Sequence, residues 1–99
     1  MMKYKITNEA QNDLENIWFY TYENWSIKQA DRYYKLLLDE IEYLANNPKV
    51  GQDYSHVRKD YLRSNVKSHL ILYKINQKEN LIEIIRILHQ RMDVEKLKR

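Results

Sequence analysis

The most apolar stretch of the chain runs Leu81-Ile82-Glu83-Ile84-Ile85-Arg86-Ile87-Leu88. Its length and its richness in isoleucine are typical of a buried strand, so we expect it to be the central strand of a sheet. The sequence then turns polar, and the segment Arg86-Ile87-Leu88-His89-Gln90-Arg91-Met92-Asp93 places two arginines, a histidine and an aspartate around the strand end. Such a group of side chains can hold or attack an anion, or it can simply be solvated surface.

Two further strands are expected upstream of this run. Residues 61–67 have the pattern of a polar, half-exposed strand, and residues 70–75 that of a more apolar one. The polar connection at residues 76–80 is short enough for a hairpin. Before these strands, Pro48 and the single glycine, Gly51, indicate a loop.

The N-terminal half has helical periodicity. Residues 4–7 can form a short strand, after which Asn8 is the predicted N-cap of a first helix with Gln11 as its capping-box partner. The apolar stripe of this helix consists of Ala10, Leu14, Ile17, Trp18, Thr21 and Trp25, and Asp13, Glu15 and Glu23 are expected to point elsewhere. Ser26 and Gln29 repeat the capping pattern for a second helix, which Pro48 ends after Asn46 and Asn47.

The predicted order is β-α-α-β-β-β in a single α+β domain of residues 1–99. Two amphipathic helices with a short joint form an antiparallel hairpin, and burying their stripes requires that it pack on one face of a mostly antiparallel sheet. The other sheet face is then partly open, and Arg63, Lys74 and Arg86 are the strand residues expected to line it. Asp93 is expected to cap a last short helical turn.

Charge divides the chain into two halves. Residues 1–52 carry 6 Lys/Arg and 8 Asp/Glu, a balance of −2, whereas residues 53–99 carry 11 and 6, a balance of +5. A basic half suggests an acidic partner, either nucleic acid or an acidic protein segment. The nine tyrosines and two tryptophans suit an interface, although such residues also line small cores.

Composition excludes several classes of site. The chain has no cysteine, which excludes disulfides, thiolate metal sites and a cysteine nucleophile. One glycine excludes the glycine-rich loops that cradle phosphates, and no cofactor is expected. The N-terminus has no apolar signal region and no stretch is long enough to span a membrane, so a cytoplasmic protein is expected.

The three histidines, His56, His69 and His89, have no metal-binding spacing, so no metal site is predicted. His69 begins a predicted strand and is expected to be a structural histidine. His89 is flanked by Arg86 and Arg91, and cations lower the pKa of an imidazole, which favours the neutral form of a general base. With Arg63 as a third cation, the group could cleave RNA. Alternatively, Arg86 pairs with an acidic group such as Glu83 and His89 only ends the strand.

The order and spacing of several residues resemble those of the ParE branch of the RelE/ParE toxin superfamily. The marks include Tyr4, Ile6, Ala10, Asp13, Leu14, Ile17, Tyr20, Trp25, Gln29-Ala30, Leu44-Ala45-Asn46-Asn47-Pro48, Gly51, Arg63, His69, Tyr73 and the segment Arg86–Asp93. Members of this superfamily are the toxin halves of bacterial type II toxin–antitoxin pairs, and the resemblance covers nearly the whole chain. It implies the same β-α-α-β-β-β fold and a cognate antitoxin with an acidic segment as partner.

The resemblance leaves the target open. ParE-like toxins, often called plasmid-stabilisation proteins, inhibit DNA gyrase, whereas RelE-like toxins cut mRNA on the ribosome. The first hypothesis is therefore a non-enzymatic gyrase inhibitor, with Arg63, Arg86, Arg91 and Tyr73 contacting antitoxin, target or phosphate. The second is a ribosome-dependent endoribonuclease with His89 as general acid/base, and the third is an inactive homologue that only binds antitoxin. No membrane contact is expected, and nucleic acid only indirectly.

Overall fold

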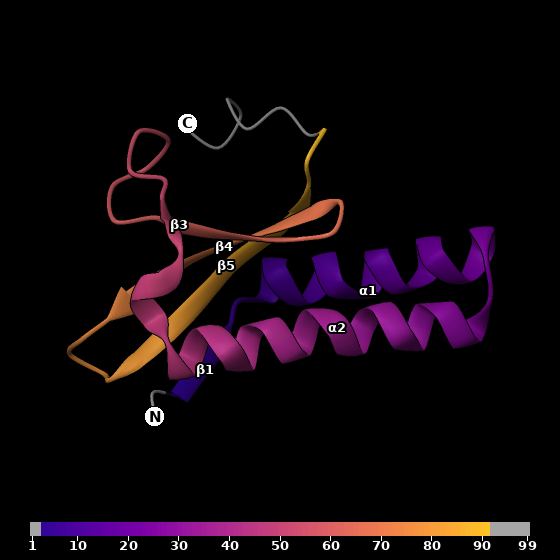
Figure 1. Ribbon diagram of the computed structural model, residues 1–99, viewed down its shortest axis with the longest axis horizontal. Helices are drawn as coiled ribbons and strands as arrows, with labels where there is room; N and C mark the ends of the chain where they lie inside the picture. The colour runs from indigo at the N-terminus through magenta and orange to yellow at the C-terminus, as the bar shows by residue number, and fades with distance from the viewer. Residues whose placement is uncertain (1–2, 92–99) are drawn as a thin grey trace.

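The computed structural model describes residues 3–91 and contains two helices packed on a five-stranded sheet (Figure 1). The elements are β1 (Lys3–Ile6), α1 (Asn8–Asn24), α2 (Ile27–Asn46), the 3-10 turn η1 (Pro48–Val50), β2 (Gln52–Asp53), β3 (Leu62–Val66), β4 (His69–Asn76) and β5 (Leu81–His89). The predicted α+β class and element order are confirmed, with η1 and β2 as short additions. The expected helical turn capped by Asp93 lies outside the described residues.

The strands follow the order β1-β5-β4-β3-β2. β1 runs parallel to β5, and every other pair is antiparallel. β4 is therefore the middle strand of the five, and the run at residues 81–88, which was expected to be central, forms β5, an interior strand between β1 and β4. The N-terminal strand makes β5 interior over part of its length only, because Lys3–Ile6 pair with Leu81–Ile84 and no further. Beyond Ile84, β5 becomes an edge that faces the first turns of α1.

Side-chain caps start both helices. Thr7, rather than the expected Asn8, is the N-cap of α1, because its hydroxyl accepts a hydrogen bond from the Ala10 N–H at 3.1 Å and donates one to the Ile85 carbonyl at 2.9 Å. The second bond ties the helix start to β5. Ser26 caps α2 as predicted, accepting from the Gln29 N–H at 3.1 Å.

The two helices cover one face of the sheet and continue beyond its end (Figure 1). Their inner stripes pack on β3, β4 and β5 to form the main core. Its buried members are Ala10, Leu14, Leu37, Ile41, Leu44, Ala45, Val66, Ile71, Tyr73, Ile82, Ile84 and Ile87. Within the described part of the chain, neither helix has the length and apolar character needed to cross a membrane.

The second sheet face is partly covered and remains partly open, with Lys74 half-exposed on it. The loop between β2 and β3 folds back over it, and Tyr54 and Val57 pack with Leu70, Leu72 and Leu88 in a smaller core. The sequence did not predict this layer, because a loop of polar residues with two apolar ones has no periodicity. Arg63 does lie on this face, but its guanidinium stacks over the Tyr54 ring at 5.2 Å and its Nε donates to Gln52.

Gly51 and Tyr73 join the loop to the core. The Tyr73 hydroxyl accepts the Gly51 N–H at 3.0 Å and donates to the Pro48 carbonyl at 2.8 Å. A Cβ at position 51 would come within 2.8 Å of the Tyr73 ring and still closer to its hydroxyl, so only glycine allows this approach. Burial is the main cause of the raised pKa of Tyr73. Tyr73 was expected to contact a partner. It is fully buried, so its side chain packs in the core and is not available at the surface.

Candidate partner-binding groove and histidine pair

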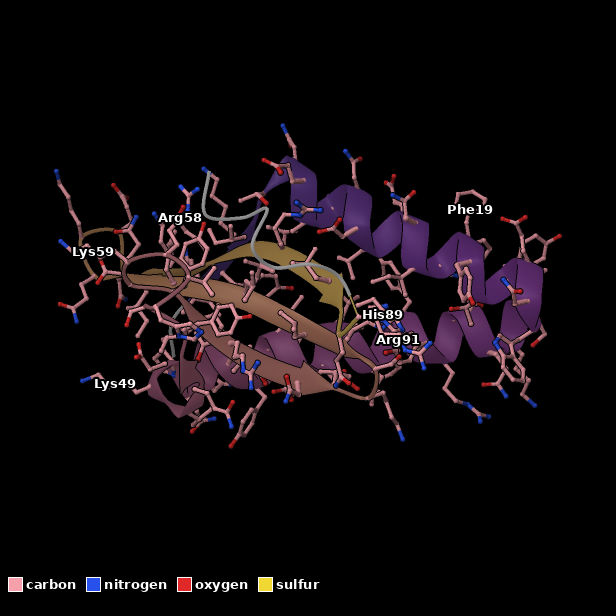
Figure 2. The ribbon with its side chains drawn as sticks, turned by 90° about the horizontal axis from the view of Figure 1, so that it is seen from above. Phe19, Lys49, Arg58, Lys59, His89 and Arg91 are labelled. Atoms are coloured by element: carbon pink, nitrogen blue, oxygen red, sulfur yellow. The ribbon has the colours of Figure 1, made fainter. Side chains whose placement is uncertain are left out.

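A groove of about 730 Å³ lies between the helical hairpin and the ends of β4 and β5. It forms because β1 stops early and the two helices extend past the sheet. Figure 2 shows His89 and Arg91 at this end of the sheet, beside the helices. Its lining residues include Ile17, Tyr20, Trp25, Tyr33, His69 and His89.

Arg86 and Asp13 form one wall of the groove. The guanidinium donates from Nε and Nη2 to the two Asp13 carboxylate oxygens at 2.8 and 3.1 Å, and Glu9 lies 3.6 Å from Nη1. Asp13 also accepts the Ile87 N–H at 2.9 Å, which satisfies a donor on the β5 edge. The hydrogen bond with Asp13 is the main cause that raises the pKa of Arg86.

This arrangement corrects two expectations. Arg86 was expected to line the open sheet face or pair with Glu83, and Asp13 was expected to point away from the core. A bulge in β5 leaves Ile85 without a partner on β4 and pairs Arg86 with Leu72, so the backbone at Arg86 is in register with the second sheet face. The guanidinium nevertheless binds Asp13 of α1, because β1 pairs with β5 only as far as Ile84 and leaves the β5 edge open at Arg86. Asp13 lies one helical turn from both Ala10 and Ile17, so helical spacing alone predicts that it shares their inner face.

We expect Arg86→Met to lower the free energy of unfolding by about 2–3 kcal/mol, because it leaves the Asp13 carboxylate, only 13% exposed, without its cation. Urea denaturation monitored by tryptophan fluorescence measures this change. Lys35→Met is the control, since Lys35 makes an exposed pair with Asp39 whose loss should cost less than about 0.5 kcal/mol. Equal effects of the two substitutions would contradict a structural role for Arg86.

His69 and His89 face each other across β4 and β5. Their rings meet edge to face with centroids 5.2 Å apart, and the Tyr33 hydroxyl from α2 lies 2.6 Å from His69 Nδ1. The same hydroxyl lies 3.2 Å from the Val66 carbonyl. Both contacts are satisfied if His69 Nδ1–H donates to Tyr33 and Tyr33 donates to Val66, an assignment that follows from the hydrogen-bond network.

His89 has the opposite tautomer. Its Nδ1 accepts the backbone N–H of Arg91 at 3.1 Å, so a neutral His89 carries its proton on Nε2. The pair therefore offers one lone pair, on His69 Nε2, beside one N–H donor, on His89 Nε2. Burial is the main cause that lowers the pKa of His69, and the neighbouring His89 lowers it further. Burial also raises the pKa of Tyr33.

The lowered pKa of His69 predicts how stability depends on pH. The unfolded state binds a proton at His69 near pH 6.5 more readily than the folded state does, so stability falls as pH drops below about 6.5. Urea denaturation between pH 7.5 and 5.5 should show this loss, and His69→Gln should reduce it. His56→Gln is the control, because His56 is exposed on the loop, away from the groove, where its ring meets that of Tyr54. Identical pH slopes in the wild type and His69→Gln would be inconsistent with this interpretation.

The structure does not gather the predicted site residues around His89. Arg91 is exposed beside it, but Arg86 is held by Asp13, Arg63 lies on the other sheet face, and Tyr73 is buried. Within residues 3–91, no group of three or more acidic or histidine side chains could hold a metal ion. Lys49, Arg58 and Lys59 lie at the end of the molecule opposite Phe19 (Figure 2).

Two residues of the groove, Tyr33 and His69, had no functional role predicted from the sequence. Tyr33 lies in the predicted second helix, and His69 was expected only as a structural histidine at the start of a strand. The cross-strand pairing that brings His69 to His89 depends on the bulge in β5, which shifts the register by one residue and has no signal in the sequence pattern. The contact with Tyr33 depends on how α2 crosses the sheet.

The far end of the hairpin exposes large apolar side chains on two sides. Tyr20 and Trp25, 67% and 75% exposed, line the groove. On α1, Trp18 stacks on Tyr22 with ring centroids 5.5 Å apart and meets Phe19 edge to face at 5.3 Å. We call Trp18, Phe19 and Tyr22 the aromatic cluster. Exposed aromatics grouped in this way mark protein-binding surfaces.

Comparison with known proteins identifies the family to which the chain belongs. Residues 4–94 match the family described as the ParE toxin of the type II toxin–antitoxin system parDE. The chain belongs to this family. It is 36% identical over 94 residues to Toxin ParE1 of Mycobacterium tuberculosis, with 95% of each chain covered, and 36% identical over 93 residues to Toxin ParE1 of Caulobacter vibrioides, with 94% covered. The protein is thus a toxin of a type II toxin–antitoxin system.

Solved structures of other toxins share the fold. A chain of the chromosomal ParDE system from P. aeruginosa matches with a TM-score of 0.75 and 17% identity, over 90% of this chain and 96% of the other. A chain of the toxin–antitoxin complex RelBE2 from Mycobacterium tuberculosis matches with a TM-score of 0.70 and 17% identity, over 89% and 96%. These likenesses confirm the RelE/ParE-like architecture.

Proposed function

We propose that this ParE-family toxin is neutralised by a cognate antitoxin that places an acidic segment in the groove. The structural relatives come from ParDE and RelBE toxin–antitoxin systems. Apolar groove walls with exposed Tyr20 and Trp25 suit an amphipathic segment, and His89 and Arg91 at the groove end suit its acidic residues.

We further propose that the toxin acts by binding DNA gyrase rather than by cleaving RNA. One observation carries this proposal: among residues 3–91, the arginines expected to assist a phosphate-cleaving site, Arg63 and Arg86, are not assembled around His89. Arg86 neutralises Asp13, and Arg63 stacks on Tyr54 on the opposite sheet face. In their place, the aromatic cluster offers a surface for a protein. Gyrase acts in the bacterial cytoplasm, where we propose that the toxin works, with plasmid stabilisation as the biological role.

The purified toxin should inhibit gyrase supercoiling at micromolar concentration. Phe19→Ala should weaken inhibition about 5–30-fold, as expected for an aromatic anchor, while changing stability by less than about 0.5 kcal/mol because Phe19 is 56% exposed. Tyr43→Ala, an equally exposed aromatic near the other end of α2, should have no effect. Supercoiling that is untouched by the wild-type toxin would refute the gyrase target, and equal loss in both variants would refute the aromatic cluster as the contact.

A ribosome-dependent endoribonuclease is the second candidate, because His69 and His89 offer a base and an acid side by side in one groove. This activity predicts mRNA cuts in the A-site codon, seen by primer extension on translating ribosomes, that His89→Gln abolishes and His56→Gln preserves. Absence of cuts at toxic expression levels would exclude it. An inactive homologue would produce neither cuts nor growth arrest.

A further inference from the structure

We propose that His69 and His89 form a carboxylate-binding subsite, which takes one aspartate or glutamate side chain of the antitoxin together with one proton. The consequence is that antitoxin binding tightens as pH falls. This inference rests on the proposed antitoxin binding in the groove, and adds the chemistry of one subsite and a dependence on pH.

The first argument is the unused hydrogen-bonding capacity of the two rings. Each Nδ1 is already bound, His69 to Tyr33 and His89 to the Arg91 backbone N–H. Among residues 3–91, no hydrogen bond reaches Nε2 of either ring, and both rings line the groove. A polar atom at a groove wall without a protein partner is available to a ligand.

The second argument concerns where an added proton goes. Protonation of His89 at Nδ1 would break its bond with the Arg91 N–H, whereas His69 can accept a proton at Nε2 without losing its bond with Tyr33. The pair then presents two N–H donors, on His69 and His89, from adjacent strand positions. Two donors side by side match the two oxygens of one carboxylate, and the positive charge strengthens both bonds.

The surrounding charges leave room for an incoming anion. From α1, Asp13 faces the groove, but it is bound to Arg86 and the Ile87 N–H; Glu9 also pairs with Arg86. From α2, only the neutral Tyr33 touches the pair, and Arg91 follows β5 as an exposed cation. Within residues 3–91, no carboxylate therefore occupies the subsite, and the exposed Arg91 contributes a positive charge beside it.

The groove favours a protein segment over a nucleic acid. Ile17, Ile87 and Trp25 make apolar walls, and the guanidinium of Arg86 is already neutralised, so the described groove lining offers a phosphate backbone no row of free cations. A segment with apolar side chains and one carboxylate matches both the walls and the histidine end. An acidic antitoxin segment that complements the basic half of the toxin would have such a composition.

Proton linkage fixes the sign of the effect. Burial and the second imidazole keep His69 neutral near pH 7 in the isolated toxin, and a bound carboxylate would favour its charged form. Binding therefore takes up a proton at neutral pH. Because two adjacent imidazolium groups repel each other, the uptake is limited to about one proton, and affinity rises at most about tenfold per pH unit as pH falls.

Calorimetry tests the proton uptake on the full chain with its antitoxin. Titrations at pH 6.5 in ACES and in bis-tris, which differ in ionisation enthalpy, give the number of protons bound. We expect uptake of about half a proton or more, and affinity that increases about tenfold from pH 8.0 to 6.0. His69→Gln and His89→Gln should each remove most of both effects, while His56→Gln should keep them.

A second experiment does not depend on the antitoxin. The imidazole resonances of His69 and His89 are followed by NMR from pH 5 to 8 in sodium acetate and in sodium chloride at equal ionic strength. Acetate should raise the pKa of His69 and leave that of His56 unchanged. Thermal denaturation of each variant shows that it is folded.

The outcomes separate this inference from the proposed function. Tight antitoxin binding with equal proton uptake in the wild type and both groove variants would overturn the subsite while leaving antitoxin neutralisation intact. Failure of antitoxin to bind at any pH would overturn both. If acetate acts equally on all three histidines, the pair has no carboxylate selectivity and the subsite is rejected.

Discussion

The paired hydrogen bonds between Arg86 and Asp13 hold α1 against the edge of β5, and the groove depends on this contact. The two residues are 73 positions apart and only partly exposed, and Asp13 also binds the Ile87 backbone. Without the Asp13 carboxylate, the Ile87 N–H on the edge of β5 would lose its acceptor, and Arg86 would keep only its longer contact with the exposed Glu9. Removing either partner of an ion pair with this little exposure strongly lowers the free energy of unfolding.

Because of this contact, the charge of Arg86 serves the fold and is not free to bind a ligand. Arg86 is the residue that, in sequence, most resembles a phosphate ligand beside His89. Its full engagement with Asp13 and Glu9 instead makes it part of the wall. What is left in the groove is the histidine pair and exposed aromatics, a combination that suits a protein segment better than a phosphodiester. The aromatic cluster on α1 adds a second apolar surface outside the groove.

Local signals predicted most of the fold. Helical periodicity, Ser26 with Gln29, and Pro48 located the hairpin, and the apolar runs located β4 and β5. Contacts between distant segments were not predictable in this way. The parallel addition of β1, the loop that covers the second sheet face, and the pairing of His69 with His89 each depend on tertiary packing that no local pattern specifies. Asp13 had the right helical spacing, but its charge assigned it to the surface.

A double-mutant cycle at Asp13 and Arg86 tests most directly whether Arg86 serves the fold. The free energy of unfolding is measured by urea denaturation for the wild type, Asp13→Asn, Arg86→Met and the double variant. A coupling energy of about 2 kcal/mol is predicted, because either single change breaks the same paired hydrogen bonds. A coupling below about 0.5 kcal/mol would contradict the structural role and return Arg86 to the candidates for partner or phosphate binding.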